Sequence, residues 1–135
     1  MTEPIELPPE ELMTRVLFSE TKDMEDAIAI ANIIKNRLAR PKRFGDTLEK
    51  VIFAPKQFSG VNSAEWKKIE QGTLTPQEQE IYNQFKDISR NVIIGAISDT
   101  TGGADHYFNP KLVKPKWSEK MKKTYSTDYH EYYKE

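Results

Sequence analysis

The sequence predicts a mostly helical single domain with one short extended or β-hairpin segment near residues 100–110. Apolar residues recur at helical spacing along most of the chain, and several of these runs begin with helix-start residues. The helical period breaks at a glycine- and aromatic-rich segment near residue 100. A length of 135 residues and 37% hydrophobic content suffice for one compact core. We therefore expect a loose arm over residues 1–7 and one folded domain over residues 8–135.

The first helix is expected from about Pro9 to Thr21, because proline followed by acidic residues is typical of a helix start. Its apolar residues repeat at helical spacing; they are Leu12, Met13, Val16 and Leu17. Glu20 follows Leu17 by three positions and Val16 by four. Its side chain is therefore expected to point to the side that the core occupies.

The second helix is expected after a polar turn over residues 23–26. It is apolar on nearly every side through Ile34, as in a central buried helix, and Pro41 is expected to end it. A third helix is expected to start at Asp46, with Glu49 as capping-box partner, and to stop at Pro55.

Two further helices follow a loop near residue 60. A short one is expected at residues 64–71, closed by Gly72. A long one starts at Thr75, Pro76 and Glu78 and carries an amphipathic stripe of Ile81, Phe85, Ile88, Val92 and Ala96. The segment DTTGGADHYFNP then predicts a glycine turn and an extended piece, before a loop, a short helical piece and an aromatic tail.

Composition excludes several classes of partner. The 20 Lys and Arg nearly balance the 21 Asp and Glu, so no basic excess favours nucleic acid. There is no cysteine, hence no disulfide or thiolate metal site, and no stretch approaches a membrane span. The acidic amino terminus is unlike a secretory signal. We expect a monomer without membrane insertion, made in the cytoplasm and delivered elsewhere if its substrate lies outside.

Glu20 is the candidate acid for glycosidic bond cleavage. This chemistry needs a protonated carboxyl at the leaving oxygen, which partial desolvation favours. An acid on an apolar helix face beside a polar loop fits that need. The structural alternative is that Glu20 ends its helix on the rim, either half-exposed or paired with a cation such as Arg37.

The remaining candidates are less specific. His106 and His130 are too far apart for a short metal motif, so neither a metal nor another cofactor is expected. Gly102 and Gly103 indicate a tight turn, and the lysine run from Lys114 to Lys123 indicates a solvated face or attraction to anionic polymers. The aromatic residues either line a sugar cleft or fill the core; they are Tyr107, Phe108, Trp117, Tyr125, Tyr129, Tyr132 and Tyr133.

In their order and spacing, five blocks resemble the SleB-type cell wall hydrolases, the family of spore-cortex-lytic enzymes and related wall hydrolases. The blocks are LMTRVLFSE, AIAIANIIKNRL, FGDTLEKVIFAPKQFS, TGGADHYFNP with KPKW, and YHEYY. The resemblance implies a lysozyme-like catalytic domain that acts on peptidoglycan glycan strands, with Glu20 as its catalytic glutamate. It implies substrate-binding positions at Gln57, Phe58, Ser59, His106, Tyr107, Asn109, Trp117, His130 and Tyr132.

The chain also departs from the family pattern. Members usually carry a glycine and a second acid shortly after the catalytic glutamate, where this chain has Lys22, Asp23 and Met24. The resemblance implies cleavage between MurNAc and GlcNAc by a lytic transglycosylase, which uses one acid and leaves 1,6-anhydro-MurNAc ends. The alternatives are hydrolysis, with Asp23, Asp105 or Asp128 as second acid, and an inactive wall-binding or virion module.

Overall fold

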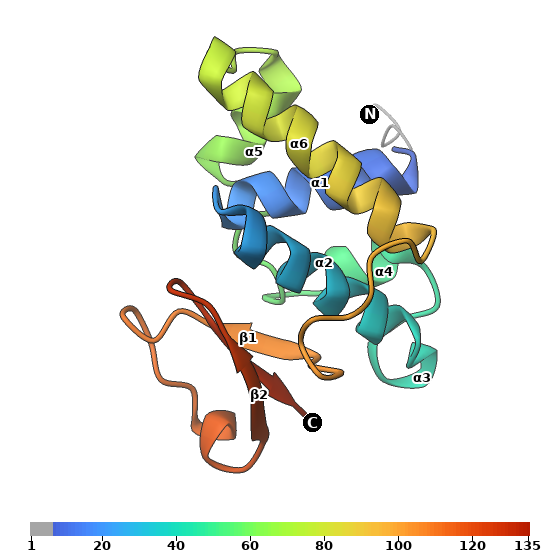
Figure 1. The fold of residues 1–135 in the computed structure, drawn as a ribbon, viewed down its shortest axis with the longest axis vertical. Helices are drawn as coiled ribbons and strands as arrows, with labels where there is room; N and C mark the ends of the chain where they lie inside the picture. The colour runs from blue at the N-terminus through green and yellow to red at the C-terminus, as the bar shows by residue number, and fades with distance from the viewer. Residues whose placement is uncertain (1–6) are drawn as a thin grey trace.

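The computed structural model describes residues 7–135, so the predicted arm over residues 1–7 lies, apart from Leu7, outside the described residues. Six helices come first, followed by a small sheet (Figure 1). The helices are α1 (Pro9–Glu20), α2 (Met24–Leu38), α3 (Pro41–Phe44), α4 (Leu48–Ile52), α5 (Ala64–Gln71) and α6 (Pro76–Ile93). The strands are β1 (His106–Phe108), β2 (Lys122–Ser126) and β3 (Glu131–Lys134), with a 3₁₀ turn η1 (Lys116–Glu119) before β2. The predicted helical class with an extended piece near residue 106 is confirmed.

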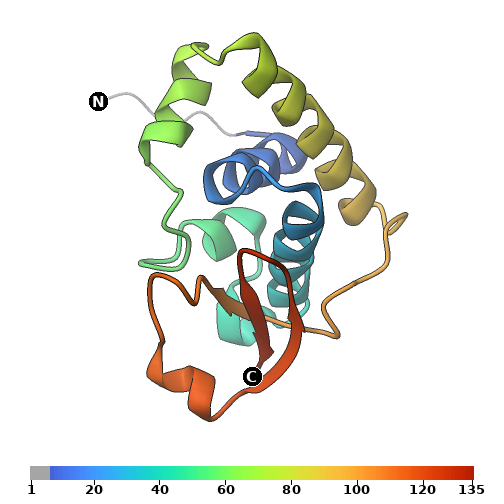
Figure 2. The same ribbon diagram turned by 60° about the vertical axis from the view of Figure 1, so that its left-hand side comes forward.

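Helix α2 is the centre of the core, as its apolar sequence predicts. Ile30, Ile33 and Ile34 have no exposed surface. Helices α1 and α6 pack on α2 and on each other, and the sheet lies beside α2 (Figures 1 and 2). The apolar stripe of α1 faces this core, which brings Glu20, the last residue of α1, to the edge of the helical layer.

Local capping explains most helix boundaries. Thr75 and Glu78 form the predicted capping box at the start of α6, and Gly72 closes α5 in the left-handed conformation with φ 68°. Several expectations were wrong by small shifts. Helix α2 begins at Met24, inside the predicted turn over residues 23–26, and α6 ends at Ile93, before Ala96 of the predicted stripe. Thr47, not Asp46, caps α4, because its hydroxyl accepts the amide of Lys50. Pro41 begins α3 rather than only ending α2, since proline fits the first helical position.

The sheet contains a hairpin that the sequence did not reveal. Its strand order is β1, β3, β2, with antiparallel pairing that sets Tyr107 opposite Tyr132 and His106 opposite Tyr133. Tyr132 and Tyr133 are both buried although they point to opposite faces. Tyr132 packs into the helical core, whereas Tyr133 stacks on Phe108 with ring centroids 5.5 Å apart. Burial on both faces hides the alternation that would have predicted a strand.

Within residues 7–135, no helix has both the length and the apolar character needed to cross a membrane.

Candidate functional site

A cleft of about 810 Å³ opens where α1 ends, between the loop before α5 and the segment around β1. Its lining combines polar, charged and apolar side chains. The lining residues are Ser19, Glu20, Thr21, Lys22, Asp23, Lys56, Gln57, Ser59, Tyr107, Phe108, Asn109, Leu112, Val113, Tyr129 and His130. A hollow of this size, lined by the acids Glu20 and Asp23 among other polar groups, is suited to an extended polar ligand.

The Glu20 carboxylate is oriented by the loop that follows α4. The Ser59 hydroxyl donates to its Oε2 at 3.2 Å, and the backbone amide of Gly60 donates to its Oε1 at 3.3 Å. Each oxygen thus has one donor, which fixes the plane of a half-buried carboxyl at the cleft wall.

Gly60 makes this close approach possible. A Cβ atom at position 60 would lie 2.6 Å from Ser19 Cβ and 3.4 Å from Glu20 Cδ. Any side chain would therefore push the loop away from α1 and weaken both contacts to Glu20. Sequence reasoning missed Gly60; its position directly after the QFS block was the available signal.

Arg37 does not pair with Glu20, so that part of the structural alternative was wrong, although Glu20 does end α1 and is half-buried. The Arg37 guanidinium donates to Gln57 Oε1 at 2.9 Å and to the Asp105 carbonyl at 2.8 Å. Across residues 7–135, no Lys, Arg or His lies within ion-pair distance of the Glu20 carboxylate. Arg37 instead ties the Gln57 loop and the β1 segment to α2.

Tyr107 is an aromatic residue of the cleft whose hydroxyl is affected by the charge of Glu20. Its ring stacks on Tyr132 with centroids 5.6 Å apart, and the residue lines the cleft. Burial first, and then the negative charge of Glu20, raise the pKa of the Tyr107 hydroxyl well above its ordinary value. The hydroxyl therefore stays protonated near neutral pH and remains a hydrogen-bond donor.

His130 lines the cleft from the turn before β3 and is anchored by a buried acid. Its Nδ1 lies 2.7 Å from Oδ2 of Asp26, which is fully buried in the first turn of α2. Thr127 and Tyr132 donate to Oδ1 of the same carboxylate. Burial opposes ionisation, but the hydrogen bonds from His130 and Tyr132 outweigh it and lower the pKa of Asp26. Because Nδ1 is engaged, Nε2 is the ring nitrogen left for a ligand.

The structure brings together part of the predicted site. The cleft lining includes Glu20, Gln57, Ser59, Tyr107, Asn109 and His130, and it does not include Phe58, His106, Trp117 or Tyr132. His106 precedes Tyr107 on β1 and so points to the opposite face, against Trp117 at 5.0 Å between ring centroids. Phe58 is buried under Arg37, and Tyr132 lies beneath Tyr107.

Similarity to known proteins decides the family. The sequence model described as Cell Wall Hydrolase matches residues 21–133, most of the chain. The chain belongs to this family. Among solved structures, the catalytic domain of the Bacillus cereus SleB protein superposes with a TM-score of 0.69 and 27% identity, over 93% of this chain and 89% of that one.

Other proteins are similar to this chain in fold or in sequence. The catalytic domain of germination-specific lytic transglycosylase SleB from Bacillus anthracis shares the fold, with a TM-score of 0.62 and 22% identity over 98% of this chain and all of that one. Spore cortex-lytic enzymes from Oceanobacillus iheyensis and Halalkalibacterium halodurans are 29% and 28% identical over 111 residues. The match covers 79% of this chain but only 34% and 29% of theirs. The predicted lysozyme-like, SleB-type fold is confirmed.

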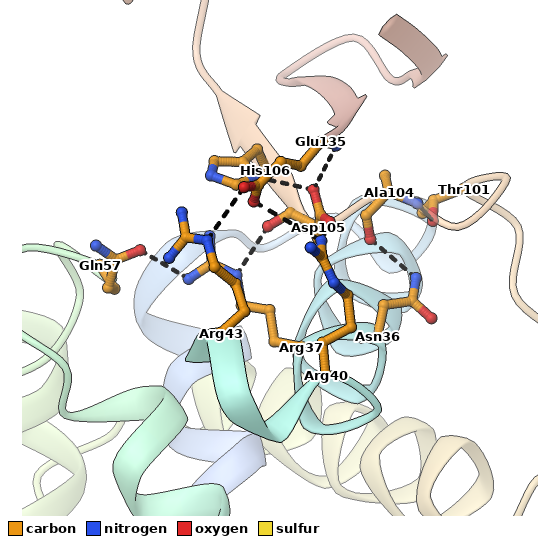
Figure 3. A network of polar contacts seen from close by, with 10 residues as sticks. All are labelled: Asn36, Arg37, Arg40, Arg43, Gln57, Thr101, Ala104, Asp105, His106 and Glu135. Carbon is orange, nitrogen blue, oxygen red and sulfur yellow. Dashed lines mark hydrogen bonds and ion pairs between the residues drawn. The ribbon is translucent and has the colours of Figure 1, made fainter. Parts of the chain in front are cut away.

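A second polar cluster lies outside the cleft lining (Figure 3). Asp105, His106 and Glu135 bring three ligand atoms within 4.8 Å of one another, a spacing that suits a metal ion. However, arginine side chains already form ion pairs with these carboxylates. Arg40 lies 2.7 Å from Asp105, and Arg43 lies 3.1 Å from Glu135. The cluster fits a structural ion network that joins the last strand to α2 and α3 better than it fits a cation.

Proposed function

We propose that this domain cleaves the bond between MurNAc and GlcNAc in peptidoglycan strands, as a lytic transglycosylase with Glu20 as its only catalytic acid and base. The observation that carries the proposal is the placement of Glu20 at the cleft wall, with one hydrogen-bond donor on each carboxylate oxygen. Membership of the Cell Wall Hydrolase family and the names of its spore cortex-lytic relatives supply the substrate class.

In the first step, protonated Glu20 gives its proton to the glycosidic oxygen while the bond from that oxygen to C1 of MurNAc breaks. GlcNAc leaves with a free 4-hydroxyl, and positive charge develops at C1. In the second step, the Glu20 carboxylate removes the proton from the 6-hydroxyl of the same MurNAc, whose oxygen bonds to C1. The acid is thereby restored, and the product ends in a 1,6-anhydro ring.

The neighbouring groups have roles that follow from their chemistry. The Tyr107 hydroxyl, kept protonated by burial and by the Glu20 charge, stabilises the carboxylate formed after the first step. Gln57, Asn109 and the free Nε2 of His130 offer polar contacts to N-acetyl and hydroxyl groups along the cleft.

Hydrolysis remains the second candidate because Asp23 lines the same cleft. The Oδ2 atom of Asp23 also accepts a hydrogen bond from the backbone amide of Asp26 and so caps the start of α2. This carboxylate therefore already has a structural role. The other two candidate acids do not line the cleft: Asp105 is buried in the network of Figure 3, and Asp128 is exposed on the turn before β3.

A zymogram on purified peptidoglycan tests the proposal directly. The purified domain should give a cleared band, and soluble muropeptide fragments should appear in the digest. Clearing that is absent at every protein concentration tested, with the strands still bound, would favour an inactive wall-binding module.

Gly60→Ala should reduce cleavage strongly. The added methyl group meets Ser19 Cβ at 2.6 Å and displaces the donors to Glu20, and a misplacement of about 1 Å can lower a rate by roughly 100-fold. Initial rates of fragment release measure the effect. Gly72→Ala is a control for backbone strain without a clash, because a side chain at φ 68° is strained but no atom lies within 4 Å of the Gly72 Cβ position. Equal rates for the two variants would contradict the role given to Gly60.

Chelators should leave cleavage unchanged. The proposed route uses only proton transfer by Glu20, and arginine side chains occupy the carboxylates of the Asp105, His106 and Glu135 cluster. Initial rates before and after dialysis against EDTA measure this. Loss of turnover that zinc restores would show that a metal ion takes part.

A further inference from the structure

A second, smaller cavity of about 320 Å³ adjoins the cleft, and we call it the side hollow. Phe108, Pro110, Val113, Lys114, Glu131 and Tyr133 line it. Phe108 and Val113 line the cleft as well. The two cavities therefore meet at these two side chains, and a ligand in the cleft can extend a branch into the side hollow.

One wall of the side hollow is aromatic and firmly packed. Phe108 and Tyr133 lie on neighbouring strands with their rings stacked, and Trp117 meets both rings edge-on at 5.5 Å between centroids. Pro110 restricts the backbone where the following loop leaves β1. Such a cavity keeps its shape without a ligand and suits small aliphatic groups.

One positive charge in the side hollow is left for a ligand. The Glu131 carboxylate lies 3.3 Å from Lys123 Nζ and accepts the Tyr133 hydroxyl at 3.0 Å. Lys114 is exposed and, across residues 7–135, has no carboxylate within ion-pair distance. The cavity thus combines an aromatic wall, the ion-paired carboxylate of Glu131 and the unpaired cation of Lys114.

On the basis of the proposed function, we propose that the side hollow binds the stem peptide carried by the lactyl group of MurNAc. This peptide branches sideways from the glycan strand, begins with small side chains and bears carboxylates. Its branching matches a cavity that opens from the cleft wall, its methyl groups match the Phe108 and Tyr133 surface, and a carboxylate pairs with Lys114. The side hollow therefore gives preference for strands that retain their peptides.

Two preparations of the same glycan strands test this subsite: one with stem peptides, and one from which an amidase has removed them. Wild type should cleave the first with the higher kcat/KM. Lys114→Gln should lower kcat/KM on peptide-bearing strands by about 3-fold to 5-fold, the range of an exposed ion pair, and leave stripped strands unaffected. Lys111→Gln is the matched control, since Lys111 is exposed on the same loop but lines neither cavity.

Three results would overturn the peptide subsite while leaving the proposed function intact. These are equal cleavage of both preparations by wild type, no effect of Lys114→Gln on either, and an equal loss on both, which would indicate general attraction to the strand. No cleavage of either preparation by wild type would instead remove the proposed function, and the reaction on which the subsite rests.

Discussion

Glu20→Gln should abolish nearly all turnover while the domain folds normally and still binds glycan. Glutamine keeps the size of the side chain, accepts the Gly60 amide through its oxygen, and can donate to the Ser59 hydroxyl through its nitrogen. It can neither give nor take a proton in the pH range of interest. The rate of fragment release should fall by at least the ~100-fold expected for loss of general acid–base catalysis.

The comparison needs a matched variant and a binding measurement. Glu70→Gln is suitable, because Glu70 is exposed on α5 and lines neither cavity. It should retain wild-type rates, and both variants should sediment with insoluble peptidoglycan as wild type does. Wild-type turnover by Glu20→Gln would remove Glu20 from the mechanism.

Asp26→Ala should have the largest effect on stability. The Asp26 carboxylate joins α2 to the hairpin through His130, Thr127 and Tyr132, and its removal leaves these groups without their buried partner. We expect the free energy of unfolding in urea to fall by on the order of 3 kcal/mol. Asp87→Ala, at an exposed position on α6, should change it by less than about 0.5 kcal/mol. A similar small change for Asp26→Ala would show that the network does not stabilise the fold.

The Asp26 network also predicts a pH dependence. Its hydrogen bonds lower the pKa of Asp26 below the ordinary value of 3.8, so the folded state binds this proton less readily than the unfolded state. The stabilising contribution of the ionised Asp26 is complete above about pH 4 to 5 and is lost as the pH falls through the pKa of Asp26 in the folded state. The difference in unfolding free energy between wild type and Asp26→Asn should therefore shrink on acidification from pH 6 to pH 2. A difference that stays constant over this range would contradict the lowered pKa.

Local signals in the sequence were enough for most helices and for the position of Glu20. The Thr75 capping box and Gly72 act through atoms close in sequence, so their meaning is readable without the fold. The apolar period of α1 likewise located Glu20 at the edge of the core before any contact was known. The family resemblance added Gln57, Ser59, Tyr107, Asn109 and His130, which the structure brings to the same cleft.

The features that sequence reasoning missed depend on contacts between distant segments. Gly60 matters only because α1 lies 2.6 Å from the position of its missing Cβ. The sequence predicted Asp26 only as part of a polar turn. Its role depends on hydrogen-bond partners that lie about a hundred residues later, in the hairpin. His106 was placed with Tyr107 at the cleft, although strand geometry sends adjacent side chains to opposite faces.

Mass spectrometry of a complete wild-type digest of purified peptidoglycan tests the single-acid mechanism most directly. If Glu20 alone performs both proton transfers, the new muramic acid ends should carry the 1,6-anhydro ring and be lighter by one water than reducing ends. Digests that contain only reducing ends would contradict this account, because water would then be the nucleophile and a second base, with Asp23 as the cleft candidate, would be needed.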